Sequence, residues 1–140
     1  MRIVYRVAAC AATVALSALV PANIASAAET IPFQIDPAPF GNPNGSFDAP
    51  SVRCVAIVGE HPGSVTITGG KDDRWGCLLM ADVQWLNLST GTSGTARLSD
   101  GLNGIPAAAV VPTGAGQVVV VVTSSAGGVI TPGIGTFSVP

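Results

Sequence analysis

Glycine and proline interrupt this chain so often that they decide which secondary structure most of it can form. The 140 residues include 17 Gly and 11 Pro. Downstream of residue 27, no stretch of about 12 residues both lacks these two types and keeps the helical hydrophobic period. Short runs rich in β-branched residues recur between the breaks, and such runs are typical of strands. The sequence therefore predicts an all-β fold.

Residues 1–27 have the pattern of a secretory signal peptide. Arg2 and Arg6 precede an uncharged, apolar run of 14 residues at 7–20. That run is shorter than the ~20 residues that a membrane-spanning helix needs. Ala25 and Ala27 then match the small-residue pattern of a cleavage site, with cleavage after Ala28 as the nearest alternative. We therefore expect a secreted or cell-envelope protein without a stable membrane span after signal removal.

Residues 28–140 carry few charges, and their balance is acidic. Only 10% of the whole chain is Asp, Glu, Lys or Arg, against about 25% in ordinary soluble proteins. Downstream of the signal there are four basic and eight acidic residues, which gives a net charge of −4. Nucleic-acid binding relies on clustered positive charge opposite the phosphates, so no nucleic-acid partner is expected.

Two cysteines, Cys54 and Cys77, remain in the exported chain, because Cys10 lies within the signal. An even number of cysteines in an oxidising compartment favours a disulfide. Closing a loop of this length is worth about 3 kcal/mol in the loop-entropy model. A redox pair is the alternative, but neither cysteine belongs to a Cys-x-x-Cys motif.

The strand pattern predicts an extended arm at 28–50, rich in Pro, Gly and Asn, followed by a β-sandwich domain at 51–140. An eight-stranded barrel is the alternative architecture. We expect seven or eight short antiparallel strands, at 31–35, 52–58, 65–68, 77–88, 95–98, 105–111, 117–123 and 136–139.

Two of these expected strands carry specific predictions. In 77–88, the face that holds Cys77 and Trp85 is predicted to point into the core. The five consecutive valines at 118–122 show no alternation, which predicts a central strand buried on both faces.

Several segments resemble strands of immunoglobulin-like domains. The stretch 83–87, followed by the loop at 90–94, resembles a middle strand of such a sandwich, and 116–123 resembles a later core strand. With the signal and the ending at 132–140, the chain resembles uncharacterised small secreted immunoglobulin-like β-sandwich proteins of high-GC Gram-positive bacteria.

The resemblance covers about 50–140 and implies an immunoglobulin-like β-sandwich, but it brings no functional residue with it. It departs from antibody-type domains in the order of three residues. There the two cysteines bracket the core Trp along the chain, whereas here Cys54 and Cys77 both precede Trp85.

Candidate catalytic groups are sparse. His61 is the single His, and it stands in a Glu-His-Pro-Gly turn, where a solvated side chain is the simpler interpretation. One His and two bridged cysteines cannot supply the ligands of a zinc site. Asp72 and Asp73 lie between Lys71 and Arg74, which opposes Ca²⁺ binding and indicates a charged loop tip. We therefore expect no cofactor, no metal and no enzymatic activity.

Trp75 is the candidate binding residue that stands out, together with the neighbouring Arg74, Asp72 and Asp73. A disulfide at Cys77 would hold this aromatic side chain in place, so that little entropy is lost on contact with a partner. The alternative is that Trp75 caps one end of the core.

Three functions follow from the sequence. The first is a non-catalytic secreted or envelope-associated module that binds an extracellular protein, glycan or lipid of unknown identity. The second is a self-associating structural envelope protein, because an exposed valine-rich strand can pair across sheet edges. The third is a small secreted hydrolase, which would require some of four carboxylates to converge, those of Glu60, Asp72, Asp73 and Asp82.

Overall fold

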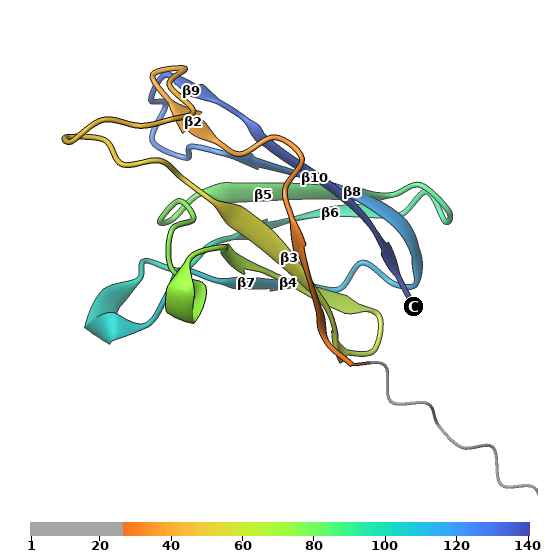
Figure 1. Cartoon of the computed structure of the whole chain (residues 1–140). Helices are drawn as coiled ribbons and strands as arrows, with labels where there is room; N and C mark the ends of the chain where they lie inside the picture. Colours follow the sequence, from red (N-terminus) through yellow and green to blue (C-terminus); the bar gives the residue numbers. More distant parts are fainter. Residues whose placement is uncertain (1–26) are drawn as a thin grey trace, which may run out of the picture.

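A computed structural model describes residues 27–140 of the chain (Figure 1). Residues 1–26 of the predicted signal peptide, including Ala25 of its cleavage site, lie outside the described residues. Ala27 is the first described residue, and it is exposed.

The chain forms two four-stranded antiparallel sheets, a two-stranded ribbon and two short 3₁₀ turns. Sheet A has the order β1-β3-β4-β7, with the bounds Glu29–Pro32, Cys54–His61, Ser64–Gly69 and Ala109–Val111. Sheet B has the order β10-β8-β5-β6, with the bounds Gly133–Val139, Gly116–Thr123, Asp82–Asn87 and Ser93–Arg97. The ribbon pairs β2 (Ala38–Pro39) with β9 (Ile130–Thr131), and the turns are η1 (Asp72–Arg74) and η2 (Leu102–Gly104). The predicted all-β antiparallel sandwich is confirmed.

Alternation along β8 shows how the core is built. Val118, Val120 and Val122 are fully buried between the sheets, while Val119 and Val121 on the opposite face are half-buried. β8 pairs with β10 on one side and β5 on the other, so it is a central strand. The prediction that it is buried on both faces is wrong, because the outer face of sheet B borders solvent.

The predicted strand at 77–88 begins later than expected, at Asp82. The backbone turns at Met80, which has a φ of 51° in the left-handed region. Its carbonyl accepts hydrogen bonds from Arg97 Nε (3.1 Å) and Ser125 Oγ (2.6 Å). Leu79, predicted to point inward, is 59% exposed. These tertiary hydrogen bonds override the strand propensity of the apolar residues before Asp82.

The N-terminal segment links the two sheets. β1 pairs with β3. Three residues beyond the end of β1, the Ile35 N–H donates to the Ile134 carbonyl of β10 (3.1 Å), and the Ile134 N–H donates to the Ile35 carbonyl (2.7 Å). Phe33, between these pairings, is buried in the core. Gly135 makes room for it, because a Cβ at that position would lie 2.9 Å from the Phe33 ring.

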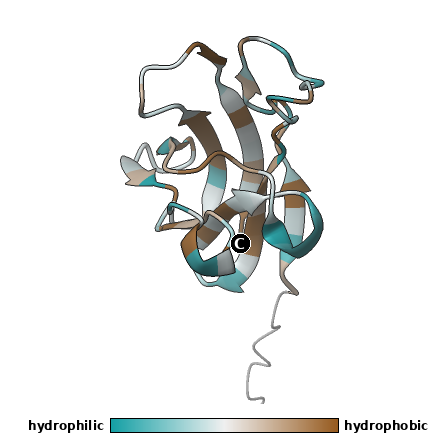
Figure 2. Ribbon diagram, turned by 90° about the vertical axis from the view of Figure 1, so that its left-hand side faces the viewer, coloured by the Kyte–Doolittle hydropathy of each residue, from teal (hydrophilic) through white to brown (hydrophobic). Residues whose placement is uncertain are grey.

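The two ends of the sandwich differ. Residue 27 lies at the lower right in Figure 1, close to the β3–β4 turn. The opposite end, which we call the distal end, carries four longer segments: residues 36–50 of the arm, the β4–β5 loop at 70–81, the β6–β7 loop at 98–108 and the β8–β9 loop at 124–129. The antiparallel registers place all four beyond the same ends of the strands. Figure 2 views the molecule from this side.

Candidate functional site

A hollow with a mixed polar and apolar lining lies at the distal end. Its volume is about 570 Å³. The lining residues come from the arm, the start of β3 and the end of β9: Gln34, Ile35, Asp36, Ala38, Gly41, Pro43, Arg53 and Thr131. Ligand sites are concave and combine apolar walls with a few placed polar groups, and this hollow has that character.

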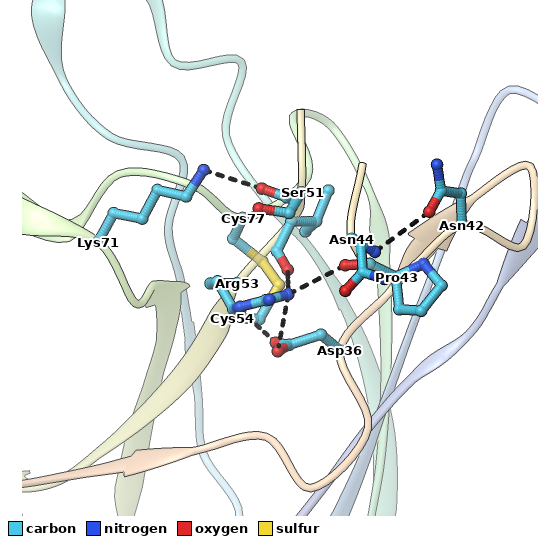
Figure 3. Close-up of polar contacts among 10 residues, drawn as sticks. Asp36, Asn42, Pro43, Asn44, Ser51, Arg53, Cys54, Lys71 and Cys77 are labelled. Atoms are coloured by element: carbon cyan, nitrogen blue, oxygen red, sulfur yellow. Dashed lines mark hydrogen bonds and ion pairs between the residues drawn. A yellow bond between two sulfur atoms is a disulfide. The ribbon is translucent and has the colours of Figure 1, made fainter. Parts of the chain in front are cut away.

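Asp36 and Arg53 form the polar framework beside this hollow (Figure 3). Asp36 Oδ1 accepts a hydrogen bond from the Cys54 N–H (2.9 Å), and Oδ2 lies 3.4 Å from Arg53 Nη1. The same Nη1 donates to the carbonyls of Val52 (2.9 Å) and Pro43 (3.4 Å). These contacts fasten the arm to the first residues of β3, so the shape of the hollow is set by the fold.

The β4–β5 loop is fastened to the same region. Cys54 and Cys77 form the predicted disulfide, and Lys71 Nζ donates to the Ser51 carbonyl (2.8 Å). Figure 3 shows the disulfide, Lys71 and Arg53 side by side. The arm and the loop are therefore positioned relative to one another by one covalent bond and a set of polar contacts.

The predicted binding residues all lie on this loop. Asp72, Asp73 and Arg74 form η1, and Trp75 ends it with 39% of its surface exposed. All four are exposed, and none lines the hollow beside Arg53. They lie at the distal end on the β4–β5 loop, outside the hollow.

The β4–β5 loop folds back over the outer face of sheet A. The Arg74 carbonyl accepts a hydrogen bond from Thr68 Oγ1 (3.3 Å), and Thr68 and Thr66 on that face are buried. Gly69 permits this close approach, because a Cβ there would overlap the backbone of Trp75.

Glu60 anchors the loop on sheet A. Its carboxylate forms an ion pair with Arg74 and accepts a hydrogen bond from Thr66 Oγ1 (2.9 Å). The hydrogen bond from Arg74, followed by that from Thr66, holds the pKa of Glu60 below its ordinary value of 4.5. The charged Glu60 carboxylate therefore holds the β4–β5 loop against sheet A.

The structure separates two of the four carboxylates that the hydrolase hypothesis names. Glu60 forms an ion pair with Arg74 on sheet A, whereas Asp82 lies on sheet B, where its Oδ1 is 3.7 Å from Arg97 Nε. Among residues 27–140, no group of three or more His, Cys, Asp or Glu side chains could hold a metal ion. His61 is exposed at the β3–β4 turn, away from the distal end.

An apolar rim borders the distal end. Phe40 and Val129, at the tip of the β2–β9 ribbon, are 78% and 75% exposed, and Phe47 is fully exposed. Phe40 and Val129 also line a smaller, mostly apolar hollow of about 180 Å³ together with Leu78. Figure 2 shows apolar residues at the tip of the ribbon.

Sequence reasoning missed Asp36 and Arg53 as site residues. Their only local signal is that Arg53 precedes Cys54 and that Asp36 opens the Pro-rich arm. Their proximity depends on the arm returning to the start of β3, and no local periodicity encodes that return.

None of the described residues forms a helix long and apolar enough to cross a lipid bilayer. Comparison of the chain with protein-family models, curated proteins and solved structures finds no match.

Proposed function

We propose that this chain is an exported, non-catalytic binding module that contacts an extracellular protein, glycan or lipid through its distal end. The observation that carries the proposal is the arrangement of that end. A fixed hollow beside Arg53 adjoins an exposed apolar rim that includes Phe40 and Val129.

Three physical features support this function. The disulfide and the Asp36–Arg53 contacts hold the loops in place, so ordering them on binding costs little entropy. Exposed aromatic side chains such as Phe40 and Trp75 supply apolar contact area that a partner can bury. The distal end also lies opposite residue 27, so a signal or anchor at the N-terminus leaves it accessible.

The proposal is tested by capture from the culture medium and cell wall of the source organism, with purified protein immobilised through its C-terminus. Three variants are compared with the wild type: Phe40→Ser and Trp75→Ala at the distal end, and Leu88→Ser at the opposite end. Leu88 is a matched control, because it is also an exposed apolar loop residue, with 58% of its surface accessible.

We expect a bound component that both distal variants lose and that Leu88→Ser retains. Equal capture by all four proteins would contradict the proposal, as would loss that is confined to Leu88→Ser. Far-ultraviolet circular dichroism of each variant verifies that the sandwich is intact.

A further inference from the structure

Within residues 27–140, β6 stands out among the four outer strands of the two sheets, because its outer edge has neither a proline nor a backbone hydrogen-bonded neighbour. The edge of β10 is covered by Ile35, which forms two backbone hydrogen bonds with Ile134. The Gln34 side chain covers it further on, through bonds to the backbone N–H (2.6 Å) and carbonyl (3.3 Å) of Thr136.

The outer strands of sheet A are protected in other ways. β1 contains Pro32, which lacks an N–H for pairing with a further strand. β7 has only three residues and is followed directly by Pro112. Its approach is occupied by Ser99, whose N–H donates to the Ala108 carbonyl (3.1 Å). Short strands, prolines and covering segments are the usual means by which proteins block edge pairing.

β6 lacks a proline, and its outer edge forms no backbone hydrogen bonds with another described strand, although β7 of sheet A lies close to it. Its five residues, Ser93–Arg97, contain no proline and one charged side chain, and the strand pairs only with β5. The bonds at its two ends, from the Leu98 N–H to Ala81 and from the Asn87 N–H to Thr92, fix which backbone groups face β5. Because these groups alternate along an antiparallel strand, those of Ser93, Thr95 and Arg97 point away from the sheet.

We infer that β6 pairs antiparallel with β6 of a second copy of this chain, which joins the two B sheets across a two-fold axis. The register that uses all three outward residues places Thr95 opposite Thr95 and Arg97 opposite Ser93. Threonine pairs are favourable neighbours across strands. The single charged residue of the strand meets a hydroxyl and no like charge, so the edge is complementary to itself.

Side chains next to the edge favour the same occupant. Trp85 lies over Gly94, where a Cβ would be 2.7 Å from the indole Cζ2, and the Trp85 side chain is only half-buried. Gly94 and Ala96 are small and half-buried on the inner side of β6. A second strand beside them would cover part of Trp85 from water, and burial of apolar surface adds to the backbone pairing.

The β6 edge replaces the valine-rich strand that the self-association hypothesis invoked. That hypothesis depended on the valine run at 118–122, but β8 is paired on both sides and offers no edge. The exposed backbone belongs to β6, a polar strand that sequence inspection would not select.

The test is sedimentation equilibrium of the purified protein over a wide concentration range, with Thr95→Pro as the variant. The Thr95 N–H points away from β5, so proline removes no hydrogen bond of the folded monomer and is compatible with an edge strand. We expect a wild-type dimer and an association at least about tenfold weaker in Thr95→Pro. A wild-type protein that is monomeric at every concentration would overturn the inference, and so would undiminished association of the variant.

Two further variants test the register. Ser93→Glu places a carboxylate opposite Arg97 of the other copy and should tighten the dimer at low salt, whereas Ser93→Lys should weaken it. Equal effects of the two changes would exclude this register. Amide hydrogen exchange provides a direct readout: exchange at Ser93 and Thr95 should slow as concentration rises, while exchange at Ala96, which faces β5, should not change.

Discussion

Asn87 shows how much of this fold depends on a single side chain. It is fully buried, and its Nδ2 donates to the carbonyls of Thr113 and Ala115, both at 2.9 Å. Its Oδ1 accepts from the N–H groups of Ser89 (2.9 Å) and Thr90 (3.1 Å). One side-chain amide therefore hydrogen-bonds the backbone of two loops, β5–β6 and β7–β8, at the end opposite the distal end.

Replacing Asn87 by alanine should lower the free energy of unfolding by about 2–4 kcal/mol, because several buried backbone groups lose their partner. Urea denaturation measures the change. Asn44→Ala is the control, because Asn44 is exposed, and it should change the free energy by less than about 0.5 kcal/mol. Similar values for the two variants would refute the structural role assigned to Asn87.

The Glu60 carboxylate should make the free energy of unfolding depend on pH. Its folded-state pKa lies below the ordinary value of 4.5, so the stabilising interaction is complete above that pH and is lost as the pH falls through the folded pKa. We predict that wild type is more stable than Glu60→Gln at neutral pH, by no more than about 1 kcal/mol because both partners are partly exposed.

The difference should shrink as the pH falls below about 4.5. Thermal unfolding of both proteins across this range measures it, with Arg74→Met as a second variant that removes the same ion pair. A difference that stays constant down to strongly acidic pH would contradict the assignment.

At the scale of elements, the sequence predicted most strands but not the segments that shape the candidate site. Hydrophobic alternation and Gly–Pro breaks are local, and they placed β3, β4, β6, β8 and β10 within a few residues. They failed at residues 77–81, where apolar residues follow a loop path imposed by Met80 and its tertiary hydrogen bonds.

The site was only partly predictable for the same reason. The disulfide could be predicted from cysteine count and compartment, and Trp75 could be singled out from its place beside Cys77. The hollow beside Arg53 could not, because it forms where the arm returns to β3, and this return depends on contacts such as that of Asp36 with Cys54.

The disulfide that ties the β4–β5 loop to β3 should contribute measurably to stability. Replacing Cys54 and Cys77 together by alanine should destabilise the protein by about 3 kcal/mol, because the unfolded chain gains freedom over the 23-residue separation. Guanidinium denaturation of the variant against the oxidised wild type measures the loss. Unchanged stability would show that the loop is held by its polar contacts alone.

At the scale of the whole molecule, the two surfaces that we propose for contacts are separate. The distal end carries the hollow, Phe40 and Trp75, while the β6 edge lies along the side of sheet B. A dimer formed through β6 would leave both distal ends open. Because the two β6 strands pair antiparallel, the distal ends would point in opposite directions, so the dimer could contact two separate partners.

An amide hydrogen-exchange footprint of the captured complex would locate the surface that contacts the partner. We predict slower exchange on binding in the arm at 36–50, in the loop at 70–81 and around Val129. The β3–β4 turn and the loop at 88–92 should exchange as in the free protein. Protection confined to that opposite end, with the distal segments unchanged, would contradict the account.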